Sequence, residues 1–262
     1  MLSLIPISDA NPTKRLPVVT IGLIIANVIA FLQEPWRSAQ GLTNYFFQHA
    51  PVPCQLTDEC SRLISGELIE IPQRSVGSFL FTVLFSTFLH ANLLHIAGNM
   101  LFLWVFGNNI EDHLGRVRYL LFYLAGGVTA AMAHVLWALQ TTSESCVSPG
   151  VIESACVPAV GASGAVAAVM GAYILLYPKA RVNVLVPIFF LITVVQMSAF
   201  AVLGLWFLYQ FLIAAQDLAG PSGVAWMAHV GGFVFGLVMI FVLGGRPHRQ
   251  EPAWARWDRD RY

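Results

Sequence analysis

The sequence predicts an all-α membrane protein with six transmembrane helices, and three observations carry this prediction. Hydrophobic residues make up 57% of the 262 residues and charged residues only 11%, whereas a soluble domain carries about 25% charged residues. The mean hydropathy of the chain is +0.69. The apolar residues are gathered into long runs, and most basic residues fall in alternate loops between those runs.

Six apolar runs are candidates for crossing the hydrocarbon core of a bilayer, which takes about 20 helical residues. In chain order they cover residues 16–32, 91–106, 119–139, 160–177, 199–215 and 225–243. The apolar stretch that ends in the fifth run is too long for one crossing. We therefore expect its first part, 182–197, to be an interfacial or partly inserted segment containing Pro187. The six runs define a core at 16–243, preceded by a short segment (1–15) and followed by a polar tail (244–262).

The distribution of Lys and Arg predicts the orientation of the core. If the N-terminus is cytoplasmic, 11 of the 14 basic residues lie on the cytoplasmic side, and the three outside are Arg37, Arg62 and Arg74. Cytoplasmic loops are enriched in Lys and Arg, so we expect both termini to be cytoplasmic. No removable signal peptide or transit peptide is recognisable. The chain is therefore expected to be a multi-pass protein of a prokaryotic inner (plasma) membrane.

All four cysteines fall in loops that this topology places outside, where disulfides persist. Cys54 and Cys60 follow the first run, and Cys146 and Cys156 follow the third. The favoured pairing joins Cys54 to Cys60 and Cys146 to Cys156, because each bridge closes a short local loop. A bridge across the two loops and unpaired thiols are the alternatives.

Four polar side chains inside the runs are functional candidates, because polar groups are costly within a membrane. His95 and Asn99 lie four residues apart in the second run and share a helix face. Ser163 lies near the start of the fourth run and His229 near the start of the sixth. Runs two, four and six cross in the same direction, so all four groups are expected at similar depth near the outer surface. His90 is interpreted as an interfacial residue.

These residue types suit acyl transfer. A serine is a poor nucleophile until a neighbouring base takes its proton, and His229 is a suitable base because imidazole titrates near neutral pH. His95, Asn99 and the backbone N–H of Ser163 are donors for the oxyanion that forms when a carbonyl is attacked. The start of a helix also favours an anion.

Small residues surround the candidate nucleophile and base. Gly161 and Gly164 flank Ser163, and Gly232 and Gly236 follow His229. Small residues on facing membrane helices allow close approach of the backbones. We therefore expect the fourth and sixth runs to pack directly, as a serine and a histidine on separate helices require.

The sequence lacks the residues that other classes of membrane protease, or a proton-coupled transporter, would need. No His-Glu-x-x-His motif for a metalloprotease is present, and no Asp or Glu lies within a run, as an aspartyl protease or a proton-coupled transporter would need. We therefore expect no metal and no cofactor. The formal net charge of zero gives no indication of a nucleic-acid partner.

Three motifs in order resemble those of the rhomboid intramembrane proteases: HIAGN (95–99), GASG (161–164) and AHVGGFVFG (228–236). The stretch FLHANLLHIAGNMLFLWVFGNNIEDHLG (88–115) is also similar to the second span of that family. The resemblance covers roughly residues 16–243.

This resemblance implies a six-helix rhomboid-like bundle with a Ser163–His229 dyad that has no acidic third member, and with His95 and Asn99 in the oxyanion hole. It implies that the protein cleaves single-span membrane proteins near the outer edge of their membrane segment, within the lipid bilayer. The alternative function is a non-catalytic rhomboid-like protein that binds membrane clients. The intact dyad favours the protease.

Overall fold

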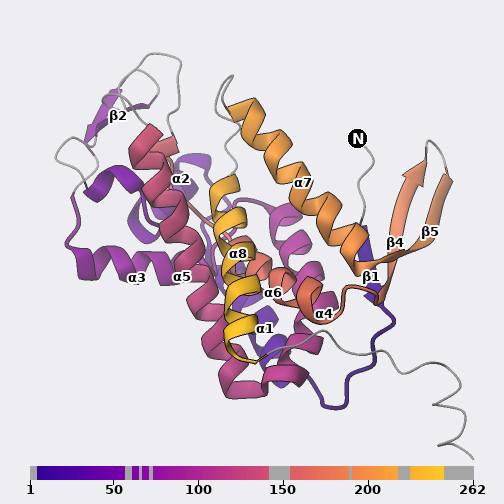
Figure 1. Ribbon diagram of the computed structural model, residues 1–262. Helices are drawn as coiled ribbons and strands as arrows, with labels where there is room; N and C mark the ends of the chain where they lie inside the picture. Colours follow the sequence, from indigo (N-terminus) through magenta and orange to yellow (C-terminus); the bar gives the residue numbers. More distant parts are fainter. Residues whose placement is uncertain are drawn as a thin grey trace, which may run out of the picture.

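Eight α-helices and five β-strands make up the described part of the chain in this computed structural model (Figure 1). The structure describes residues 5–56, 61–64, 67–70, 73–141, 154–188, 191–217 and 225–244. The helices are α1 (Val18–Gln33), α2 (Ala39–His49), α3 (Val76–Ser86), α4 (Leu93–Leu114), α5 (Arg116–Thr141), α6 (Ser163–Leu176), α7 (Ala199–Asp217) and α8 (Trp226–Val242). The strands are β1 (Ile5–Asp9), β2 (Ser61–Ile64), β3 (Glu67–Glu70), β4 (Arg181–Ile188) and β5 (Leu191–Ser198).

Each of the six predicted runs falls on a helix, namely α1 and α4 to α8. Among the described residues, however, only α4 and α5 are long and apolar enough to cross a membrane by length and composition. The others are shorter. Helix α6, for example, has 14 residues, and at 1.5 Å per residue it is about 21 Å long, less than the hydrocarbon thickness. The fold is therefore mostly helical, and the six-span arrangement remains a proposal.

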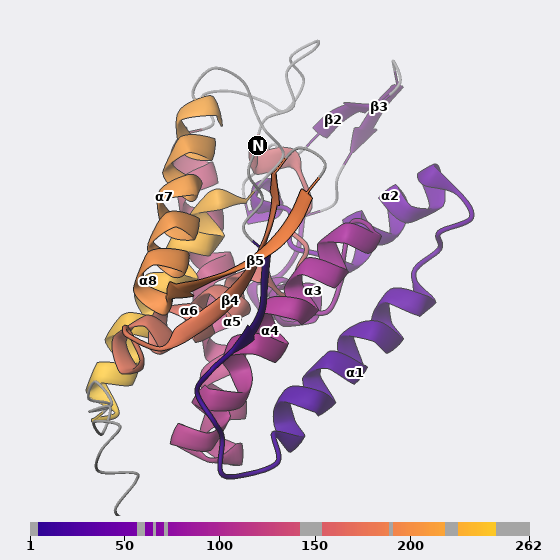
Figure 2. The same ribbon diagram turned by 90° about the vertical axis from the view of Figure 1, so that its right-hand side faces the viewer.

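The expectation of an all-α protein is wrong in two regions, the short antiparallel pair β2–β3 and the three-stranded sheet β1–β4–β5. Residues 182–197, expected as an interfacial or partly inserted segment, form most of the antiparallel pair β4–β5, in which Val184 lies opposite Val195. Strand β1 pairs with the other edge of β4, with Ile5 opposite Leu185. This sheet lies beside α4 and α7 (Figure 2). Hydropathy did not reveal the strands because it does not distinguish a strand rich in β-branched residues from an apolar helix.

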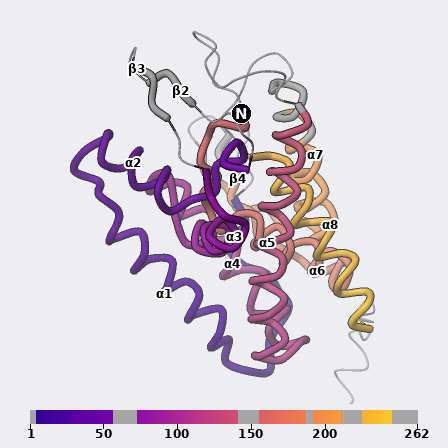
Figure 3. Tube along the Cα trace, turned by 90° about the vertical axis from the view of Figure 1, so that its left-hand side faces the viewer, coloured from indigo at the N-terminus to yellow at the C-terminus, as the bar shows by residue number. Residues whose placement is uncertain are grey.

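Helix α6 occupies the centre of the bundle and packs against α8, α5 and α4. Residues 164–173 are all buried, and most of them are Ala, Gly or Val. Such small side chains leave room for neighbouring helices to approach closely. Helices α1 and α8 lie on opposite sides of this centre (Figure 3).

Helix α1 is held to α4 through a carboxylate. Pro17, which precedes α1, provides no side-chain cap. Glu111 of α4 takes this role by accepting hydrogen bonds from the backbone N–H groups of Val19 at 2.9 Å and Thr20 at 2.8 Å. The contact satisfies N–H groups that have no partner within a helix, and it places a negative charge at the positive end of the helix dipole.

A second polar cluster ties the N-terminal segment to the bundle. Asp9 Oδ2 accepts hydrogen bonds from the hydroxyl of Tyr173 at 2.5 Å and from Nδ2 of Asn109 at 2.9 Å. Asn11 Nδ2 donates to Asn109 Oδ1 at 2.7 Å. Burial raises the pKa of Asp9 above its ordinary value. The segment before α1 is thus anchored to α4 and α6.

The loops that follow the first and third predicted runs meet near the start of α6. Cys54 lies in the 3-10 turn η1 (Pro53–Leu56) and Cys156 in η2 (Ser154–Cys156), and these turns contact each other. Both cysteines are disulfide-bonded and are buried in one cluster with Val52. Cys60 and Cys146 lie outside the described residues. The favoured local pairing of the cysteines therefore remains a prediction.

Candidate active site

Ser163 is the first residue of α6, and glycine at position 161 sets the approach to it. Gly161 has φ +130°, a conformation that residues with a Cβ rarely adopt, and its N–H donates to the carbonyl of Ser86 at 3.0 Å. A Cβ at this position would lie 2.8 Å from Cε1 of His95. The turn therefore needs glycine both for its backbone conformation and for space, and it brings His95 close to the serine.

His229 lies in the first turn of α8 and reaches Ser163 directly. The distance from His229 Nε2 to Ser163 Oγ is 2.8 Å, a normal hydrogen bond. The close approach of α6 and α8 makes this possible, because Gly232 and Gly236 face the backbone carbonyls of Gly164 and Ala168 with no side chain between them. The expected direct packing of the fourth and sixth runs is thus present.

The opposite edge of the imidazole has a partner that the sequence reasoning missed. His229 Nδ1 lies 2.7 Å from Oε1 of Gln210, which is buried on α7 with 3% of its surface exposed. The ring of Trp206, one turn earlier on α7, is centred 5.7 Å from that of His229. Gln210 is a polar residue within the predicted fifth run, towards its outer end, and the rule used for the other polar residues would have singled it out.

His95 and Asn99 both lie on α4. Asn92 caps the first turn of this helix, because its Oδ1 accepts a 2.9 Å hydrogen bond from the backbone N–H of His95. Asn99 is buried, and its Nδ2 has no hydrogen-bond partner among the described residues. An unpaired buried amide donor costs free energy, so this N–H group suits an acceptor that arrives with a ligand.

Glu34 and His90 form a buried pair beside His95. Glu34 follows α1, and its Oε1 accepts a hydrogen bond from the backbone N–H of His90 at 3.0 Å. The imidazole rings of His90 and His95 are centred 5.2 Å apart. Burial raises the pKa of Glu34 to about 7 and lowers the pKa of His90 to about 3, because each charged form is poorly hydrated there. His90 is therefore neutral at physiological pH.

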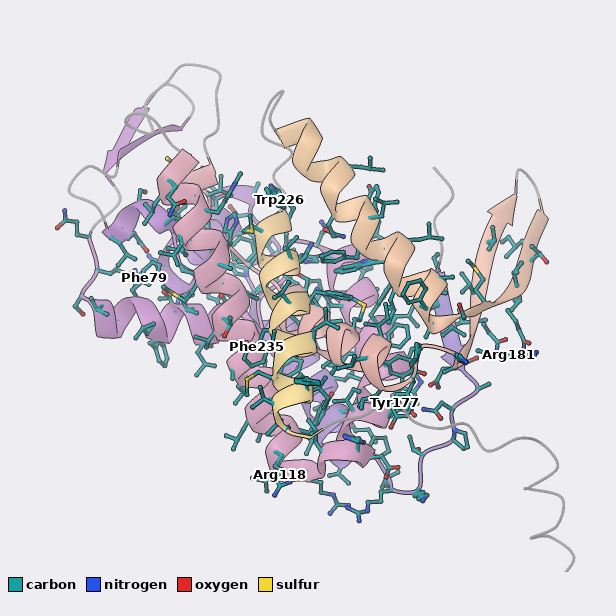
Figure 4. The ribbon with its side chains drawn as sticks, viewed as in Figure 1. Phe79, Arg118, Tyr177, Arg181, Trp226 and Phe235 are labelled. Carbon is teal, nitrogen blue, oxygen red and sulfur yellow. The ribbon has the colours of Figure 1, made fainter. Side chains whose placement is uncertain are left out.

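The site lies away from the basic end of the bundle. Figure 4 shows Trp226, at the start of α8, near one end and Arg118, at the start of α5, near the other. Within the described ranges, no three His, Cys, Asp or Glu side chains stand together as metal ligands would. The groups that do converge are the hydroxyl of Ser163, the imidazole of His229 and the side-chain amide of Gln210. A serine hydrogen-bonded to an imidazole is the arrangement by which proteins activate a serine for attack on a carbonyl.

Comparisons with known proteins show similarity over much of the chain. A family model described as Rhomboid domain matches residues 78–246. The chain is 29% identical over 160 residues to presenilin-associated rhomboid-like protein A, mitochondrial, of Danio rerio, covering 59% of this chain and 35% of that protein. It is 28% identical over 218 residues to RHOMBOID-like protein 12, mitochondrial, of Arabidopsis thaliana, covering 82% and 55%. It is 27% identical over 172 residues to Rhomboid-like protein 11, chloroplastic, of the same plant, covering 62% and 52%. The chain thus spans between about a third and about half of the length of these relatives.

Proposed function

The chain belongs to the rhomboid family, and we propose that it is an intramembrane serine protease in which Ser163 is the nucleophile and His229 the base. The observation that carries the proposal is the 2.8 Å hydrogen bond between His229 Nε2 and Ser163 Oγ. A serine placed for packing alone has no need of an imidazole at this distance.

In the proposed reaction, Ser163 Oγ attacks the carbonyl carbon of the scissile peptide bond and transfers its proton to His229 Nε2. The tetrahedral intermediate collapses as His229 returns that proton to the leaving amine, which leaves an acyl-enzyme. A water molecule then attacks the ester, again with His229 as base, and releases the new carboxyl terminus. Donors from His95, Asn99 and the backbone N–H at the start of α6 stabilise the oxyanion, and one such donor is worth about 3–4 kcal/mol.

The proposed setting is a membrane core at 16–243, with the segments 1–15 and 244–262 on the basic side. The substrates are single-span membrane proteins whose segment unwinds near the end of the bundle that carries the site. The names of the relatives refer to mitochondria and chloroplasts, which counts against the prokaryotic inner membrane expected from the sequence. The proposal is therefore limited to a multi-pass membrane protein with both termini on one side.

The test uses purified protein in detergent, with a fluorophosphonate probe and a single-span membrane substrate. The wild type should be labelled and should cleave, and Ser163→Ala should do neither. Asn99→Ala should retain slower cleavage, since other donors remain. Ser78→Ala, an exposed serine of α3, is the matched control and should behave as the wild type.

Two outcomes contradict the proposal. Equal cleavage by Ser163→Ala would exclude the nucleophile. A wild-type protein that is neither labelled nor active would favour the client-binding function, which uses the same fold without chemistry.

A further inference from the structure

We propose that Gln210 is a positioning residue for the reaction proposed above. Its side-chain oxygen accepts a hydrogen bond from His229 Nδ1 and so holds the imidazole in the tautomer whose Nε2 takes the proton of Ser163. The inference rests on the proposed function. It goes beyond the two-residue dyad that the resemblance to the family implies.

The geometry carries the inference. His229 makes one hydrogen bond at each edge of its ring, 2.8 Å to Ser163 Oγ and 2.7 Å to Gln210 Oε1. An amide oxygen only accepts hydrogen bonds, so the proton of the neutral imidazole lies on Nδ1. Nε2 is then unprotonated and accepts the serine O–H. The three residues come from α6, α8 and α7, so the side chain on α7 completes a line of hydrogen bonds through the ring.

Because Gln210 is buried, the loss of its hydrogen bond to His229 would be costly. Gln210 is 3% exposed, and a buried amide oxygen without a donor is energetically costly. The amide therefore holds the ring firmly. Because the amide is neutral, it orients the histidine without adding a charged side chain within the membrane. It fulfils the orienting role that a carboxylate has in soluble serine proteases.

A purely structural explanation is that Gln210 fastens α7 to α8. Trp206 and Phe207 already do so, with rings 6.4 Å and 4.5 Å from that of Phe233. The two explanations predict different results for Gln210→Leu, which keeps the volume but removes the acceptor. If Gln210 only fastens the helices, the variant changes stability and leaves the pH dependence of activity alone.

The experiment measures kcat, KM, the rate of fluorophosphonate labelling and the melting temperature as functions of pH. The full-length chain in detergent is compared with Gln210→Leu, Gln210→Glu and a control on the same helix, Leu208→Ala, whose side chain is 55% exposed. Gln210→Leu should lower kcat and labelling about 100-fold with little change in KM, because the imidazole loses the contact that fixes both its tautomer and its orientation. Leu208→Ala should match the wild type in kcat and in the rate of labelling.

Gln210→Glu keeps an oxygen acceptor and adds a negative charge beside the ring. The other titratable groups that act electrostatically on His229 are His95 of α4 and His134 of α5, which the substitution leaves in place. The carboxylate favours the protonated imidazole, so the acid limb of the pH–rate profile should move to higher pH by about one unit, with activity recovering above it. A change only in the packing of α7 against α8 does not move the acid limb of the pH–rate profile.

The inference is overturned if Gln210→Leu retains the wild-type kcat, or if the acid limb of Gln210→Glu stays in place. If Gln210→Leu fails to fold, the pH–rate profile of Gln210→Glu alone tests the inference. A wild type that neither cleaves nor labels refutes the proposed function first. The tautomer can still be read in Ser163→Ala from the ¹⁵N resonances of His229, which should report a protonated Nδ1 that is lost or mixed when Gln210→Leu is added.

Discussion

Substituting Gly232 by alanine tests whether the contact between α6 and α8 sets the geometry of the site. A Cβ at this position would lie 2.1 Å from the carbonyl oxygen of Gly164 and 3.0 Å from its carbonyl carbon, where ordinary contacts are 3.4–4 Å. The obstacle is backbone, so no side chain can rotate away. Relief requires the two helices to separate locally by about 1.3 Å.

The size of the effect follows from two opposing terms. Overpacking costs about 1–3 kcal/mol, and the backbone contact puts Gly232→Ala at the upper end of that range. Replacing a helical glycine by alanine gains about 1 kcal/mol in helix propensity. The net loss of about 2 kcal/mol corresponds to a fall in melting temperature of roughly 4–8 °C for a protein of this size. The same displacement breaks the hydrogen bond between Ser163 and His229, and a misplacement near 1 Å costs about 100-fold in rate.

The assay compares thermal unfolding in detergent and the rate of fluorophosphonate labelling. Gly204→Ala is the matched control, because a Cβ at that position on α7 meets nothing within 4 Å. The control should melt at or slightly above the wild-type temperature and label normally. If Gly232→Ala is as stable as Gly204→Ala and labels at the same rate, the close packing of α6 on α8 does not exist as described.

Two further substitutions test the buried polar groups. Burial raises the pKa of Glu34 from its ordinary 4.5 to about 7, so its contribution to stability is present below pH 4.5 and is lost as the pH rises through 7. Glu34→Gln should therefore raise the free energy of unfolding at pH 8 by about 1–3 kcal/mol and leave it unchanged at pH 4; melting temperatures that differ equally at both pH values would contradict this. Tyr173→Phe removes the hydroxyl bonded to Asp9 and should cost about 1–3 kcal/mol. It should also expose the N-terminal segment to protease, whereas unchanged melting and cleavage would show that the cluster does not anchor the segment.

The sequence predicted the helices that carry the candidate site because each is an apolar run with a polar residue that membrane burial makes costly. Ser163 and His229 stood out in this way, and the glycines near them indicated the close packing that brings the two together. This part of the site depends on local patterns, which a single sequence displays.

The remaining features depend on contacts between distant parts of the chain. The sheet forms only when β1 meets β4, far along the chain. Hydropathy showed that residues 182–197 are apolar, but it did not show that they form strands. Helix α3 is an apolar segment of 11 residues, too short to be counted as a span. Gln210 could have been chosen as a candidate because it is polar within an apolar run, but its role beside His229 depends on the packing of α7 against α8, which no pattern within the fifth run reveals.

The pairing of β1 with β4 has a consequence for the order in which the chain assembles. Ile5 and its partner Leu185 are separated by most of the chain, so β1 has no strand to pair with until β4 has been synthesised. At about 5–20 residues per second, this wait is roughly 10–40 s. Helices α7 and α8 emerge later still, so Gln210 and His229 reach Ser163 only after the sheet can close. The nascent N-terminal strand is therefore exposed to mispairing during synthesis, and the hydrogen bonds of the site are among the last to form.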